Sequence, residues 1–284
     1  MVSGYVGILI LVCFSFTSCY ITLVESIDGS GNLEPIGKYA MWRTYPGKFY
    51  GFQAEISLWG SPNQTYSQES GASIQMYCQD GGHYNFIEVG FHVSPSLYHN
   101  RNVRFFTYSS KDSKSAGCYN LQCKGFVPAS GAALVPGQAV APASSYGKYD
   151  RYVRLSLNQD PNSRDWVVYR HDGSKTSSFL GHFPVELCPR TPRIQALGGF
   201  VNYYNTSKGP PMGSGHFPDG KDDEKTAAFF RHVETYDSKG DTTDSDTYGM
   251  IPLVDKPNCY TETLINFDYD TGNLFYYGGP GCIG

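Results

Sequence analysis

Charged residues are scarce in this chain, and the positive ones do not gather anywhere. Charged residues make up 17% of the 284 residues, and the formal net charge is −4. A nucleic-acid site needs a basic patch, so we expect no nucleic-acid partner. Beyond residue 19 no apolar run is long enough to cross a bilayer, and we therefore expect no stable membrane span.

Signatures of common catalytic and metal sites are also missing. The segment "MGSGHF" does not have the spacing of a nucleophile elbow, so Ser214 is not expected to act as a nucleophile. The sequence has no H-E-x-x-H and no pair of C-x-x-C motifs, and the aspartates of residues 236–249 do not follow the spacing of a calcium loop. The segment "GSGHFPDG" lacks the third glycine of a phosphate cradle. We therefore expect no metal ion and no cofactor.

Apolar and aromatic side chains dominate instead, at 40% and 15% of all residues, which excludes a disordered protein. From Trp42 onward, short β-rich runs alternate with clusters of Gly, Pro, Asn, Asp and Ser, and none carries a sustained helical stripe. No fixed repeat and no linker divides them. The pattern predicts one all-β domain over residues 42–284, either an antiparallel sandwich or a barrel.

The first residues are typical of a secretory leader. An apolar run from Tyr5 to Phe16 is followed by small residues suited to cleavage near Cys19. No lysine or arginine precedes this run, so a short uncleaved anchor is the alternative. We interpret residues 1–19 as a signal peptide and residues 20–41 as a short linker, and we expect a secreted, extracellular protein.

Cysteines and glycosylation motifs agree with export. The sequons at Asn63 and Asn205 predict N-glycosylation in the secretory pathway. An even number of cysteines in an exported chain favours disulfides, although their number alone leaves the pairing open. The cysteines that follow the leader are Cys78, Cys118, Cys123, Cys188, Cys259 and Cys282.

One predicted strand, residues 85–93 with the sequence "NFIEVGFHV", carries a carboxylate among apolar residues. Strand side chains alternate between faces, so Glu88 and His92 share one face and Phe91 lies on the other. Glu88 is then either a solvent-facing residue or the floor of a site. His92 lies about 13 Å along the strand from Glu88, too far for a direct hydrogen bond in a regular strand.

The order of motifs along the chain resembles the neprosin family, over about residues 42–284. The motifs that carry the resemblance are "FYGFQAEISLWG", "FIEVGFHVSPSLYHNRNVRFFTY", "GCYNLQCKGFV", "LGHFPVEL", "LGGFVN", "PMGSGHFP", "KTAAFFRHVETYD", "PNCY" and "YYGGPG". The resemblance implies an antiparallel β-sandwich of two packed sheets. It also implies relation to secreted glutamic endopeptidases, which act at acid pH, cleave after proline and use two facing glutamates.

The resemblance places Glu88 on the first catalytic glutamate and Phe200 on the second. Residues 191–206 contain no Asp or Glu, so no nearby acid restores the pair. The reaction needs one carboxylate as general base and a second, protonated carboxyl as donor. Phe200 can supply neither. The family's enzymes usually carry an activation domain between the leader and the catalytic domain, and this sequence has only residues 20–41 there. So short a segment agrees with impaired endopeptidase activity.

The resemblance also suggests groove residues and disulfides. The predicted groove is lined by His92, Phe91, His182, Phe183 and Phe200. The implied bridges are Cys118–Cys123 and Cys259–Cys282. Cys78 and Cys188 fall where the family more often has large apolar residues, and we hypothesise that they form a third bridge.

Three functions remain open from sequence alone. The leading hypothesis is a secreted neprosin-like protein with impaired catalysis and a groove that binds a proline-containing peptide or protein, or a glycan. The second is an active acid-pH endopeptidase in which His182 or His92 replaces the missing donor. The third is a lectin-like cell-wall or matrix protein, since the chain has 23 tyrosines that could stack on sugars.

Overall fold

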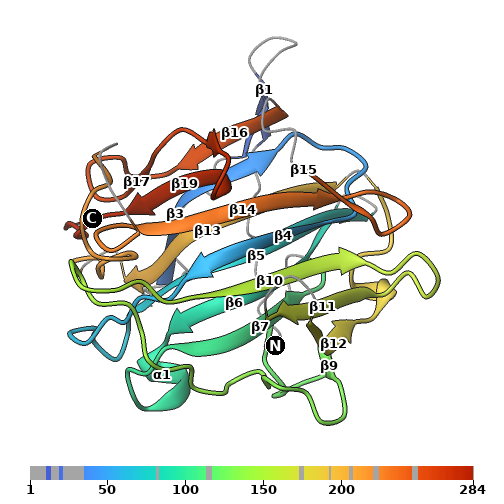
Figure 1. The fold of residues 1–284 in the computed structure, drawn as a ribbon, viewed down its shortest axis with the longest axis horizontal. Coiled ribbons are helices and arrows are strands. Elements are labelled where there is room, and N and C mark those ends of the chain that lie inside the picture. Colours follow the sequence, from blue (N-terminus) through green and yellow to red (C-terminus); the bar gives the residue numbers. More distant parts are fainter. Residues whose placement is uncertain are drawn as a thin grey trace, which may run out of the picture.

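The computed structural model describes residues 11–13, 19–21, 35–80, 83–112, 117–172, 176–191, 193–204, 207–219, 224–244 and 249–283. Most of the predicted leader and the sequon at Asn205 lie outside these residues. Two large sheets lie one over the other (Figure 1), and every strand pair in them is antiparallel. The predicted all-β sandwich is confirmed.

The first large sheet has seven strands, in the order β16-β3-β13-β5-β6-β7-β8. Their bounds are β3 Pro35–Thr44, β5 Glu69–Asp80, β6 His83–Val93, β7 Arg104–Ser110, β8 Cys118–Tyr119, β13 Arg193–Tyr204 and β16 Met250–Val254. Strand β3 pairs with both β13 and β16, so the sandwich includes described residues ahead of the predicted boundary at residue 42. Residues 35–41 belong to this sheet and not to the predicted linker.

The second large sheet has ten strands, with the main order β17-β19-β14-β4-β10-β11-β12-β9, while β15 pairs with β14 and β18 with β19. Their bounds are β4 Gly51–Ser57, β9 Val127–Pro128, β10 Tyr152–Gln159, β11 Trp166–His171, β12 Ser177–Phe183, β14 Ala228–Tyr236, β15 Thr242–Asp244, β17 Thr261–Glu262, β18 Asn266–Asp268 and β19 Gly272–Gly278. Strands β1 Leu11–Cys13 and β2 Cys19–Ile21 form a separate pair. The helical turns are α1 Pro95–Tyr98 and η1 Val185–Leu187.

The main core lies between the two large sheets. On β6 it takes Ile87, Val89, Phe91 and Val93, which alternate with Glu88 and His92 as strand geometry requires. The facing sheet contributes buried residues from β4, β10 and β11, among them Phe52, Ala54, Ile56, Leu155, Leu157, Trp166 and Val168. Burial of this apolar surface is the main force that holds the sheets together.

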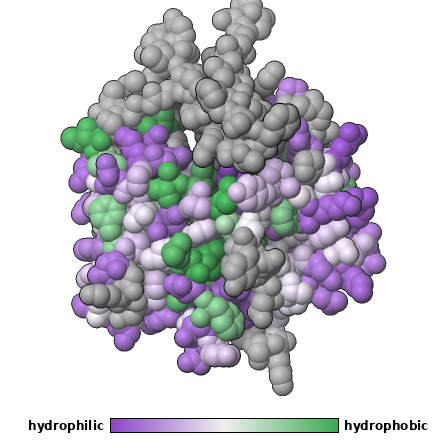
Figure 2. All heavy atoms as spheres, turned by 90° about the horizontal axis from the view of Figure 1, so that it is seen from above, coloured by the Kyte–Doolittle hydropathy of each residue, from purple (hydrophilic) through white to green (hydrophobic). Residues whose placement is uncertain are grey.

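A second, smaller cluster packs on the opposite side of the seven-stranded sheet, which we call the outer face. Its buried members are Met41, Phe106, Ala196 and Phe200, and partly buried Tyr39, Tyr108, Tyr119 and Leu253 pack against them. The outer face is thus partly covered by its own aromatic rings. On the side of the molecule seen in Figure 2, polar residues cover most of the visible described surface, and apolar residues form small separate groups.

Three disulfides cross-link the fold, and all three predicted pairings are confirmed. Their Cα–Cα distances are 5.3 Å for Cys78–Cys188, 5.7 Å for Cys118–Cys123 and 5.3 Å for Cys259–Cys282, within the usual range for disulfides. The sequon residue Asn63 lies in an exposed turn. Among the described residues, no helix is long and apolar enough to span a membrane.

Candidate ligand cavity on the outer face

Glu88 lies on the outer face of β6 and is 7% exposed, so it is not a solvent-facing residue. Strand pairing places it directly between Tyr108 of β7 and Gln75 of β5. Oε1 of Glu88 accepts hydrogen bonds from Ser73 Oγ at 2.6 Å and from Gln75 Nε2 at 2.9 Å. These two donors fix the carboxyl group against the sheet.

Burial raises the pKa of Glu88 to about 7, because a buried carboxylate loses its hydration. The hydrogen bonds from Ser73 and Gln75 oppose this rise, and the negative charge of Glu69 adds to it. Glu88 therefore titrates near neutrality and is mainly protonated at acid pH. A carboxyl in this state can donate a proton but cannot at the same time act as a base.

Glu88 opens onto a cavity of about 380 Å³. The lining residues are Tyr39, Gln75, Tyr77, Tyr84, Phe86, Glu88, Tyr108, Ser110, Tyr119, Phe200 and Asn202. The aromatic rings form a continuous series, with centroid distances of 4.5 Å for Tyr77–Phe86, 5.8 Å for Phe86–Tyr108 and 4.7 Å for Tyr108–Tyr119. Burial raises the pKa of Tyr39, Tyr77, Tyr108 and Tyr119, so these hydroxyls stay neutral.

Phe200 lines the same cavity from β13, and its register with β3 and β5 continues unbroken through Gly198 and Gly199. The ring of Phe200 packs edge-on against Phe106 at 5.8 Å. Strand pairing puts Ala196, not Phe200, in the same row as Glu88, while Phe200 shares its row with His92. Phe200 reaches the cavity from a position four residues beyond Ala196 on β13.

The other predicted groove residues do not line this cavity. Phe91 faces the main core, as strand alternation predicted, and packs against Phe105 at 5.9 Å. His182 and Phe183 belong to β12 of the other sheet, where His182 Nε2 lies 3.8 Å from Asp165 Oδ2 and Phe183 is fully buried. The structure thus does not bring these three residues together with Glu88 and Phe200, because the prediction rested on motif positions rather than on strand pairing.

His92 lies on the outer face, but both ring nitrogens are engaged away from Glu88. Nδ1 lies 2.5 Å from Glu69 Oε1, and Nε2 lies 2.8 Å from the hydroxyl of Tyr98. Tyr98 is the last residue of α1, which begins with Pro95 and is capped by His99 in the left-handed conformation. Neither His92 nor His182 is among the residues that line the cavity.

Sequence reasoning missed Glu69, Ser73 and Gln75, although the signal was present. In "ESGASIQMYC" the apolar residues at 72, 74 and 76 alternate with polar residues at 69, 73 and 75, so one face of β5 is polar. Pairing of β5 with β6 then brings Gln75 opposite Glu88. Among the described residues, no group of three His, Cys, Asp or Glu side chains could hold a metal ion.

Comparison with known proteins gives a family match and several solved structures with a limited likeness to this chain. The family model described as Neprosin matches residues 66–280. Scytalido-glutamic peptidase with a transition-state analogue inhibitor is similar at 8% identity and a TM-score of 0.42, over 86% of this chain and 98% of that chain. SCP-B, a member of the eqolisin family of peptidases in complex with the tripeptide Ala-Ile-His, is similar at 10% identity and a TM-score of 0.35, over 87% of this chain and 99% of that chain.

Proposed function

Because the chain belongs to the neprosin family, as its motifs predicted, we propose that it is an exported protein that binds proline-containing peptides and has lost most endopeptidase chemistry. The observation that carries the proposal is the composition of the cavity: Glu88 is the only carboxylate among its described lining residues, and Phe200 lies there too. Hydrolysis needs an acid and a base, and loss of one of them costs about 10²- to 10⁴-fold in rate.

The remaining lining residues suit a peptide ligand. Aromatic grooves recognise proline-rich peptides, because the extended proline helix is already ordered and its rings pack on aromatic faces. Gln75, Ser110 and Asn202 add amide and hydroxyl groups that could pair with a peptide backbone. Export is supported by the apolar leader and by three disulfides, which persist in oxidising compartments.

Glycan binding is the second candidate, and the tyrosines of the cavity favour it. Sugar rings also pack on aromatic faces, so the cavity alone does not separate a lectin-like role from a peptide-binding one. We favour peptide binding over glycan binding because peptide binding agrees with the family to which the chain belongs.

The test uses the full chain, secreted from a eukaryotic host, and a blocked hexapeptide with two prolines, Ac-Ala-Pro-Ala-Ala-Pro-Ala-NH2. Calorimetry at pH 5 and pH 7 should show binding, and mass spectrometry of the incubated peptide should show it intact. Glu88→Gln should weaken binding, whereas Glu55→Gln, a matched change of a buried strand glutamate on the other sheet, should not.

Absence of peptide binding would overturn the proposal, and so would either of two further outcomes. Cleavage after proline by the natural chain, abolished by Glu88→Gln, would establish an active endopeptidase. Binding on a glycan array together with no peptide binding would establish the lectin-like role.

A further inference from the structure

Glu69 and His92 are buried titratable residues that the proposed function does not use. Glu69 is 8% exposed and His92 is 1% exposed. The His92 ring also stacks on Phe106 at 4.0 Å. A buried pair of this kind adds little net stability, because the loss of hydration offsets the attraction between its members. We therefore expect the Glu69–His92 pair to have a role other than stabilising the fold.

The second oxygen of Glu69 contacts the wall of the cavity. Oε2 accepts hydrogen bonds from Asn202 Nδ2 at 2.8 Å and from the Tyr119 hydroxyl at 3.4 Å. Both donors line the cavity of Glu88, one from β13 and the other from β8. One carboxylate thus connects two walls of the cavity that are far apart in the sequence.

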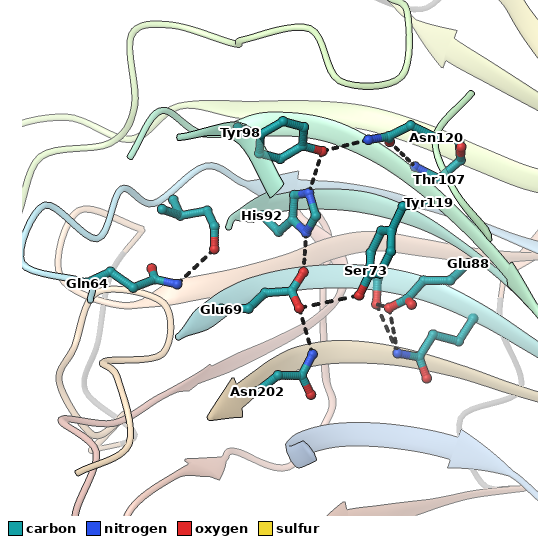
Figure 3. A network of polar contacts seen from close by, with 12 residues as sticks. Gln64, Glu69, Ser73, Glu88, His92, Tyr98, Thr107, Tyr119, Asn120 and Asn202 are labelled. Atoms are coloured by element: carbon teal, nitrogen blue, oxygen red, sulfur yellow. Dashed lines mark hydrogen bonds and ion pairs between the residues drawn. The ribbon is translucent and has the colours of Figure 1, made fainter. Parts of the chain in front are cut away.

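The other end of the network leads to α1. Asn120 Nδ2 donates to the Tyr98 hydroxyl at 2.8 Å, and Tyr98 in turn contacts His92 Nε2 at 2.8 Å (Figure 3). The two ring nitrogens of His92 thus contact Glu69 on one side and Tyr98 on the other. In this arrangement both oxygens of Glu69 accept, so its orientation is fixed from two sides.

Burial alone would raise the pKa of Glu69, but the hydrogen bond with His92 and electrostatic attraction to His92, together with the hydrogen bonds from Asn202 and Tyr119, hold that pKa below its ordinary value. Glu69 is therefore ionised at neutral pH, where Glu88 is in the middle of its titration. An ionised acceptor holds an amide and a hydroxyl more strongly than a neutral one does.

We propose that Glu69, oriented by His92, is a positioning residue for the ligand cavity, which holds the Asn202 amide and the Tyr119 hydroxyl in the orientation that a peptide backbone requires. The inference rests on the proposed function. Side chains ordered before binding lose less conformational freedom when the ligand arrives. Freeing both of them should weaken binding about tenfold.

Two variants test the inference with the blocked hexapeptide described above. Glu69→Gln removes the charge at constant size. Glu69→Leu together with His92→Phe removes the whole pair and keeps an aromatic ring on Phe106. Both should melt cooperatively and bind the peptide about tenfold more weakly, while Glu55→Gln should bind as the natural chain does. Natural affinity in either folded variant would overturn the inference.

A readout without ligand separates this inference from the proposed function. The side-chain amide signals of Asn202, assigned with Asn202→Asp, should shift and exchange faster with water in Glu69→Gln than in the natural chain. Unchanged signals would overturn the positioning role even if the peptide binds. Shifted signals in a chain that does not bind the peptide would support the positioning role and reject the proposed function.

Discussion

Glu88 and Phe200 line one cavity from strands β6 and β13, with β5 between them. The two residues are not directly opposite each other in the sheet. Across β5, strand pairing aligns Glu88 with Ala196 and Phe200 with His92. The ring of Phe200 extends over Gly71 of β5, because a Cβ atom at Gly71 would lie only 2.8 Å from Phe200 Cζ. An aromatic ring thus occupies the part of the cavity that the family resemblance assigns to a carboxyl group.

A carboxyl at position 200 should raise hydrolytic activity. In Phe200→Glu, cleavage of the blocked hexapeptide at pH 4 to 5 should increase by about 10²-fold or more, because a second acid-base group enters the cavity. Phe200→Gln, which has the same size and no acid, should stay at the natural level. Equal rates in the two folded variants would show that position 200 cannot supply the missing group.

The raised pKa of Glu88 predicts a specific pH dependence of stability. The folded state binds the Glu88 proton more tightly than the unfolded state does, since the pKa rises from 4.5 to about 7. Its stabilising contribution is complete below about pH 4.5 and is lost as the pH rises through 7. Glu88→Gln keeps the acceptor oxygen and lacks this titration.

Urea unfolding of the natural chain and Glu88→Gln at pH 4, 5.5, 7 and 8 measures the effect. The free energy of unfolding of the natural chain should fall relative to the variant, by at most about 3 kcal/mol over this interval. Titration of Glu69 is common to both proteins and cancels in the difference. A difference that does not change with pH would contradict the raised pKa.

The Cys78–Cys188 bridge should contribute more stability than the Cys118–Cys123 bridge. The first joins residues 110 apart and the second joins residues 5 apart, and the unfolded chain loses more entropy when a longer loop is closed. Replacement of both cysteines by alanine should cost about 5 kcal/mol for the first bridge and about 2 kcal/mol for the second. Urea unfolding without reductant measures both, and equal losses would contradict the prediction.

Gly71 should resist any side chain, whereas Gly60 should accept one. A Cβ atom at Gly71 would lie 2.6 Å from the Phe91 carbonyl oxygen and 2.7 Å from His92 Cβ, and neither can move easily. Gly71→Ala should therefore destabilise the protein by about 1 to 3 kcal/mol and displace the Phe200 ring. Gly60→Ala, whose nearest neighbour would be Ala143 Cβ at 3.9 Å, is the control and should melt as the natural chain does.

Much of the fold follows from local sequence. The alternation in "NFIEVGFHV" separated Ile87 and Val89 from Glu88 and His92, and the structure keeps this division. The motifs identified the family, and the six cysteines pair as expected. Residues 35–41 were missed as part of a strand, because β3 gains its stability from pairing with β13 and β16 rather than from its own composition.

The sequence by itself determined that this protein is all-β with a glutamate on the polar face of one strand, because a strand's two-residue period places each side chain on a definite face. Only the tertiary structure decided which residues surround that glutamate. It put Gln75 beside Glu88, joined Glu69 to His92 and Asn202, and placed His182 on the other sheet. Register and sheet order depend on pairing between distant segments, which the pattern of a single strand does not encode.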